Sequence, residues 1–144
     1  MVKIGIASDH GGFELKENLK SYLKEKGFDV IDYGTDSSES VDYPIYGKKA
    51  ANAVISGEVE KAVVICGTGI GISLAANKVE GIRCALCTNE YMAKMARNHN
   101  DANMLALGAR VIGDELAKSI LDTFLKEEFL AGRHKRRVDL IENC

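Results

Sequence analysis

The sequence predicts an α/β fold, a Rossmann-like three-layer α/β/α sandwich around a five-stranded parallel sheet. Short apolar, β-branched segments alternate five times with segments in which apolar residues recur at helical spacing. Parallel neighbours in a sheet need crossover connections, which are usually helices. The composition of the 144 residues does not change along the chain, so we expect residues 1–144 to form one domain.

Each expected element has a local reason. The strands are the short β-branched segments 2–7, 28–33, 62–66, 83–87 and 104–107. Gly27 ends the first helix, and Pro44, the only proline, suits the first turn of the second because its φ is already helical. The third helix begins near Ile70, and Thr88 or Asn89 can cap the fourth. Apolar spacing over 117–125 indicates a fifth helix, whereas the pattern over 133–143 leaves a further helix undecided.

The composition argues against several classes of protein. The formal net charge is −2 with both signs mixed along the chain, which disfavours binding to nucleic acid or to a membrane surface, apart from a local basic patch near the C-terminus. No apolar run approaches the roughly 18 residues of a membrane span, so we expect a cytoplasmic protein. The cysteines are too few and too uneven for a secreted disulfide scaffold. We expect reduced thiols at Cys66, Cys84, Cys87 and Cys144.

The most informative motif places a cysteine directly before three spaced glycines. Gly67, Gly69 and Gly71 follow a buried strand and allow a tight turn whose amide N–H groups converge ahead of the next helix. Converging amides and a helix N-terminus stabilise negative charge, so a thiolate at Cys66, or a charged intermediate beside it, is favoured there. A small buried side chain that ends the strand is the alternative for Cys66. The glycines favour a functional thiol.

Other polar residues follow the ends of the expected strands, where open parallel sheets bind their ligands. Asp9 and His10 follow the first strand, and Arg110 follows the fifth. A capped turn is the alternative for Asp9 and His10, because Asp and Gly are common turn formers. We expect the polar segment 34–42 to form a rim.

A histidine and two arginines lie outside these strand ends. His99 follows a helix and precedes the fifth strand, so we expect it at the opposite end of that helix from the strand tips. Within one subunit His99 is then far from Cys66, and a neighbouring subunit would bring the two together. Arg133 and Arg137 are four residues apart, so on a helix they share a face and can hold a phosphate from two sides. A solvated basic face is their alternative, and His134 is interpreted as a surface residue.

Three familiar motifs are incomplete. The glycines of 67–71 lack the final glycine of the dinucleotide fingerprint, and no lysine follows to complete a nucleotide P-loop. Cys84 and Cys87 have redox-motif spacing, but residues three apart on a strand point to opposite faces, so both are interpreted as packing residues. A thiolate phosphatase needs an arginine that closes the cysteine loop, and Ile70 to Ser73 supply none.

Taken together, these motifs resemble those of type B ribose-5-phosphate isomerases, in the group that includes galactose-6-phosphate and allose-6-phosphate isomerases. The similarity covers nearly all 144 residues. It rests on the segments SDHGG (8–12), DYP (42–44), CGTGIG (66–71), RNHND (97–101), GAR (108–110) and GRH (132–134).

The resemblance implies a cofactor-free and metal-free enzyme of the pentose phosphate pathway, which interconverts ribose 5-phosphate and ribulose 5-phosphate through an enediolate. Cys66 would be the carbon base, His99 the acid that opens the sugar ring, and Asp9 the proton carrier between sugar oxygens. Thr68 is a further catalytic candidate. Family members are dimers or larger, so a homodimer or homotetramer with shared active sites is implied. The remaining candidate contacts to substrate are His10, Tyr43, Gly67, Gly69, Ile70, Gly71, Asn100, Arg110, Arg133 and Arg137.

Two other functions stay open. An allose-6-phosphate or galactose-6-phosphate isomerase would use the same chemistry on a longer chain, and pocket depth is not visible in a sequence. A non-catalytic sugar-phosphate-binding module is the alternative of a different class, and the intact Cys66, His99 and Asp9 argue against it. The sequence also leaves open the strand order, the choice between dimer and tetramer, and the physiological direction of the reaction.

Overall fold

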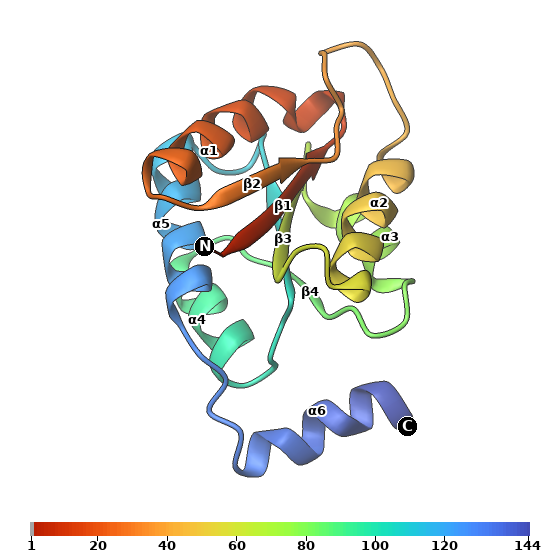
Figure 1. The fold of residues 1–144 in the computed structure, drawn as a ribbon, viewed down its shortest axis with the longest axis vertical. Helices are drawn as coiled ribbons and strands as arrows, with labels where there is room; N and C mark the ends of the chain where they lie inside the picture. Colours follow the sequence, from red (N-terminus) through yellow and green to blue (C-terminus); the bar gives the residue numbers. More distant parts are fainter. Residues whose placement is uncertain (1) are drawn as a thin grey trace.

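A five-stranded parallel sheet forms the centre of the computed structural model, which describes residues 2–144 (Figure 1). The strands lie in the order β2-β1-β3-β5-β4, and every adjacent pair is parallel. Their bounds are β1 Lys3–Ser8, β2 Asp29–Asp32, β3 Lys61–Cys66, β4 Cys84–Leu86 and β5 Met104–Gly108. With helices on both faces, this sheet confirms the predicted α/β/α sandwich.

Two groups of helices cover the sheet, as Figure 1 shows. One face carries α1 Phe13–Glu25, α4 Glu90–Asn98 and α5 Asp114–Lys126, and the other carries α2 Tyr43–Ser56 and α3 Ile70–Asn77. A short 3-10 helix, η1 His10–Gly12, precedes α1. The last helix, α6 Arg133–Asn143, lies apart from both layers at the end of the molecule (Figure 1). None of the described helices is both long and apolar enough to span a membrane.

Alternate residues of the central strands divide the apolar core into two parts. On one face, Ile6 and Leu105 pack with large side chains such as Phe124 of α5. On the other face, Ala106 packs with small side chains such as Ala50 of α2. Strands buried on both faces need this continuous apolar pattern, and small residues on one side let α2 and α3 lie close to the sheet.

Local signals determine most of the element boundaries. Pro44 lies in the first turn of α2, Ile70 begins α3, and the side chain of Asn89 caps α4 by accepting a backbone hydrogen bond at 2.9 Å. The fourth strand is shorter than expected. The backbone N–H of Arg83 donates to the side chain of Asn103 at 2.8 Å, so β4 begins one residue later than expected, and it ends at Leu86, one residue before the expected Cys87.

The strand order creates a switch point between β1 and β3. From β1 the chain continues outward to β2, whereas β5 and β4 lie on the other side of β3. Ligands of open α/β sheets bind beyond the carboxyl ends of strands at such a point. Asp9 and Cys66 stand at the carboxyl ends of β1 and β3.

Candidate active site

Cys66 is the last residue of β3 and lies opposite Gly108 in the register of β5. Its side chain is buried, with 5% of its surface exposed. The Sγ atom accepts a hydrogen bond from the backbone N–H of Gly69 at 3.2 Å, just ahead of the first residue of α3. Amide donors and a helix N-terminus both favour negative charge at this sulfur. The predicted proximity of the thiol to the glycine turn is observed.

The turn after Cys66 packs directly against neighbouring main chain. Gly69 has a φ of +82°, and a Cβ there would lie 2.5 Å from Leu86 and 2.9 Å from the carbonyl carbon of Leu107. A Cβ on Gly108 would lie 2.5 Å from the carbonyl oxygen of Thr68. No real Cβ tolerates such distances, so these two glycines are required for the close approach. The amide groups of the turn are therefore held in fixed positions.

Asp9 caps η1 and also lies beside this turn. Its Oδ1 accepts a hydrogen bond from the backbone N–H of Gly12 at 3.1 Å, which confirms the capped-turn interpretation. Gly12 in turn lies against β3, because a Cβ there would be 2.6 Å from the carbonyl oxygen of Ile65. A Cβ on Gly11 would be 3.4 Å from both Asp9 Oδ1 and the backbone N of Gly67. The carboxylate and the glycine turn thus border the same small space.

Arg110 supplies a positive charge to this space. Its backbone N–H donates to the carbonyl of Gly67 at 2.9 Å. Its guanidinium nitrogens lie 3.1 Å and 3.6 Å from the positions that a Cβ of Gly67 and a Cβ of Gly11 would occupy. In the described residues the arginine ion pairs are made by Arg83 and Arg97. The charge of Arg110 therefore remains open to an anion.

The segment 34–42, expected to form a rim, lies beside η1. The backbone N–H of Val41 donates to Nδ1 of His10 at 3.1 Å, which fastens the segment to η1. Tyr43 begins α2, and its ring lies against Gly71, where a Cβ would be 2.7 Å from the ring carbons. His10 and Tyr43 thus join the residues at the strand tips.

His99 and the α6 arginines form a second group. His99 is the C-cap of α4, and its ring stacks on that of His134 with centroids 4.0 Å apart and planes at 14°. His134 follows Arg133 in the first turn of α6, and Arg137 is one turn further. Partial loss of solvent, followed by the charges of His99 and both arginines, lowers the pKa of His134. His134 is therefore a member of this group, and it lies partly exposed at the surface, as expected.

The two groups lie at opposite ends of the strands. Cys66 pairs with Gly108 at the carboxyl ends of β3 and β5, whereas His99 and Asn100 lie on the connection that enters the amino end of β5 at Met104. The five residues of β5 separate these two ends by roughly 15 Å. Within one chain the predicted separation of His99 from Cys66 is thus observed, and the same separation applies to Asn100 and the α6 arginines.

Some residues that shape the site were not predicted. Gly12 and Gly108 belong to the motifs SDHGG and GAR, but their close contacts with main chain become visible only in the folded sheet. The hydroxyl of Ser8, at the end of β1, is buried and has no hydrogen-bond partner within residues 2–144. A small polar residue at the end of an apolar strand was the available signal for Ser8.

Cys84 and Cys87 pack as predicted. Cys84 and Cys87 belong to the cores on opposite faces of the sheet. Burial raises the pKa of Cys84 to about 12 and that of Cys87 to about 11. Both thiols therefore stay protonated near neutral pH. Within residues 2–144, no three metal-ligating side chains come together.

Comparison with known proteins identifies the family. The model of the Ribose/Galactose Isomerase family matches residues 4–141. The chain belongs to this family. Ribose-5-phosphate isomerase B of Escherichia coli K12 is 51% identical over 141 residues, 98% of this chain and 95% of that protein.

Solved structures of the family agree with this fold. The ribose-5-phosphate isomerase B of Clostridium thermocellum has a TM-score of 0.98 at 60% identity, over 99% of this chain and 96% of that one. The ribose 5-phosphate isomerase of Thermotoga maritima has a TM-score of 0.97 at 54% identity, over 99% of both chains. The resemblance seen in the motifs is confirmed, and with it the prediction that the chain is an isomerase.

Proposed function

We propose that residues 1–144 form one domain that interconverts ribose 5-phosphate and ribulose 5-phosphate, as a cytoplasmic enzyme of the pentose phosphate pathway. The observation that supports this most is the position of the Cys66 sulfur. It lies 3.2 Å from the Gly69 amide nitrogen, at the carboxyl ends of the strands, where Asp9 and Arg110 also lie. A base, an anion-stabilising turn and a phosphate-binding cation are the groups that this reaction needs. The relatives named ribose-5-phosphate isomerase B support the choice of substrate.

Cys66 acts as the base on carbon. As a thiolate it removes the proton from C2 of the open-chain aldose, and the electron pair moves onto the carbonyl to give an enediolate. The resulting thiol returns the proton to C1, which yields the ketose. The Gly69 hydrogen bond stabilises the thiolate before the transfer. No cofactor or metal is needed for this proton balance.

Asp9 moves the second proton. Between the two carbon steps a proton passes from the oxygen on C2 to the oxygen on C1, and the Asp9 carboxylate, which lies beside the glycine turn, carries it. The amides of 67–71 and the hydroxyl of Thr68 stabilise the charge that develops on oxygen. Loss of one such donor typically costs about 3 kcal/mol of transition-state stabilisation.

A neighbouring subunit completes the site. His99 opens the sugar ring, and Asn100, Arg133 and Arg137 belong to the same group of residues. In their own chain all four lie at the end of the strands opposite to Cys66. In a homodimer or homotetramer these residues reach the strand tips of the partner. There the arginines hold the phosphate together with His10 and Arg110, while Tyr43 borders the sugar. Phosphate binding far from the reacting carbons helps to position them.

A six-carbon substrate is the second candidate. The matching family model names galactose as well as ribose, and the chemistry at Cys66 is the same for a longer sugar phosphate. Allose 6-phosphate and galactose 6-phosphate are therefore the competing substrates. A module that binds sugar phosphates without isomerising them is the candidate of another class.

The test is steady-state turnover of ribose 5-phosphate and allose 6-phosphate by the purified protein. We expect Cys66→Ala to lower turnover by about 100-fold or more, the usual contribution of a general base. Cys144→Ala is the matched control, because this thiol is exposed at the C-terminus, and it should not change the rate.

Each other outcome selects a different conclusion. Near-normal turnover by Cys66→Ala would exclude the thiol as base. Preference for allose 6-phosphate would favour the six-carbon function. Binding of either sugar without turnover by the wild type would favour the binding module.

A further inference from the structure

The loop that carries His99 is held by two arginines. Asp101 has a φ of +48°, in the left-handed region that side chains rarely adopt. Arg97 donates to the Asp101 carboxylate at 2.9 Å and to the carbonyl of Ala102 at 2.8 Å. Arg83 donates to the carbonyl of Asp101 at 2.9 and 3.1 Å and to that of Asn100 at 3.2 Å. Guanidinium groups on two sides thus stabilise this conformation.

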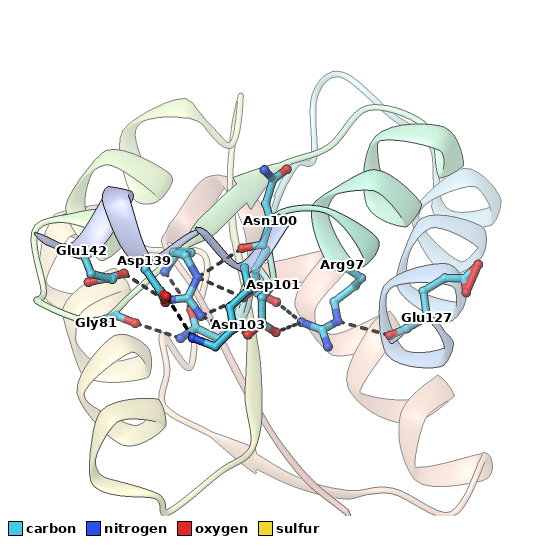
Figure 2. Close-up of polar contacts among 11 residues, drawn as sticks. Gly81, Arg97, Asn100, Asp101, Asn103, Glu127, Asp139 and Glu142 are labelled. Carbon is cyan, nitrogen blue, oxygen red and sulfur yellow. Dashed lines mark hydrogen bonds and ion pairs between the residues drawn. The ribbon is translucent and has the colours of Figure 1, made fainter. Parts of the chain in front are cut away.

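Arg83 also binds the far end of α6. Its Nη1 lies 2.9 Å from the Glu142 carboxylate, in the last turn of the helix. Figure 2 shows Glu142 close to the loop that contains Asn100, Asp101 and Asn103. The side chains of Arg83 and Glu142 are 17% and 28% exposed, so solvent screens this pair less than a surface pair.

The last turn of α6 is not closely packed against the sheet. A cavity of about 460 Å³ lies there, and its lining includes Ile141 and Glu142 of α6 together with Arg83 and Cys84. Earlier in the helix, Val138 is buried and His134 stacks on His99. The ion pair between Arg83 and Glu142 therefore joins the last turn of α6 to the rest of the molecule beside this cavity, where apolar packing is incomplete.

We propose that Arg83 is a positioning residue that holds the His99 loop and α6 as one unit. One guanidinium binds two loop carbonyls and the Glu142 carboxylate, a geometry that the single ammonium group of a lysine does not reproduce. Through this unit, Arg133 and Arg137 keep a fixed distance from His99. The kinetic consequence rests on the proposed function, whereas the coupling between Arg83 and α6 does not.

The test compares two acidic residues of α6. Glu142→Ala removes the bridge, and Glu142→Gln keeps an acceptor oxygen but loses the charge. Asp139→Asn is the matched control, because Asp139 pairs with Lys135 within the helix. We expect Glu142→Ala to raise KM for ribose 5-phosphate roughly 5- to 20-fold with kcat within about twofold, since bonds to charged groups are the stronger ones. Glu142→Gln should give a smaller rise, and Asp139→Asn no change.

A second readout does not require turnover. The NMR shifts of the His99 and His134 ring protons report their stacking, and they should move in Glu142→Ala but not in Asp139→Asn. Unmoved ring signals would overturn the proposal, as would an unchanged KM or a fall in kcat alone. If no variant or wild type turned over any sugar phosphate, the proposed function would fail, while the ring signals would still decide the role of Arg83.

Discussion

The two groups of candidate residues are held in place by different parts of the chain. At the strand tips, Cys66 is buried, and main-chain contacts at Gly12 and Gly108 leave no room for a Cβ. At the amino ends of the strands, the ring of His99 stacks on His134, and Arg83 binds the carbonyls of Asn100 and Asp101, which follow His99. The group around Cys66 is thus fixed by the sheet, and the group around His99 is fixed by side-chain contacts between the loop after α4 and the helix α6.

This difference matches the demands of the two proposed roles. Proton transfer at carbon needs groups held within a fraction of an ångström, and strand ends provide that precision. Long arginine side chains that bind a phosphate tolerate more movement. A helix that lies apart from the core can also extend toward another subunit.

Mixing inactive subunits tests whether the two groups meet across an interface. Cys66→Ala and His99→Ala should each be nearly inactive alone, and an equal mixture should recover about a quarter of wild-type turnover, because half of the random dimers then hold one intact site. Steady-state turnover after verified subunit exchange measures this. A mixture that stays inactive would show that the two residues do not complete one site across an interface.

A methyl group at the strand tips tests the rigidity of the first group. Gly108→Ala places a Cβ 2.5 Å from the Thr68 carbonyl oxygen, so the backbone must move. We expect a loss of about 1–3 kcal/mol in the free energy of unfolding, as for overpacked cores, together with lower turnover. Gly113→Ala is the control, because nothing lies within 4 Å of its Cβ position. It should change stability by less than about 1 kcal/mol, and denaturant unfolding compares the two.

Acid should destabilise the second group. The pKa of His134 is lowered in the folded chain, so the unfolded chain binds a proton at this ring more readily. The free energy of unfolding therefore falls as the pH drops below about 6.5 toward the pKa of the folded chain. An NMR titration should show His134 protonating below an ordinary histidine. Arg137→Ala should move that titration upward, since Arg137 contributes to the shift. A titration near 6.5 in both proteins would contradict the assigned environment.

The fold followed from local signals, and the strand order did not. Pro44, Ile70 and Asn89 mark helix starts through their own chemistry, which is why these boundaries were predictable. The order β2-β1-β3-β5-β4 depends on pairing between distant segments, which a single sequence does not display.

The candidate site divides in the same way. Cys66, Asp9 and Arg110 were predictable because each follows a strand end. The role of Arg83 was not, because it depends on the left-handed Asp101 and on Glu142, 59 residues further along the chain. The stack of His134 on His99 depends likewise on how α6 folds back.

The hydrogen bond between Val41 and His10 also fixes where a hydrogen atom sits. Since Nδ1 of His10 accepts the Val41 N–H, that nitrogen carries no hydrogen, and the neutral ring must hold its hydrogen on Nε2. Nε2 of His10 is then a donor. It can bind an oxygen that offers a lone pair, such as one on a phosphate, and it is mismatched to another N–H. A single backbone amide on the rim thereby selects the tautomer of a histidine at the strand tips.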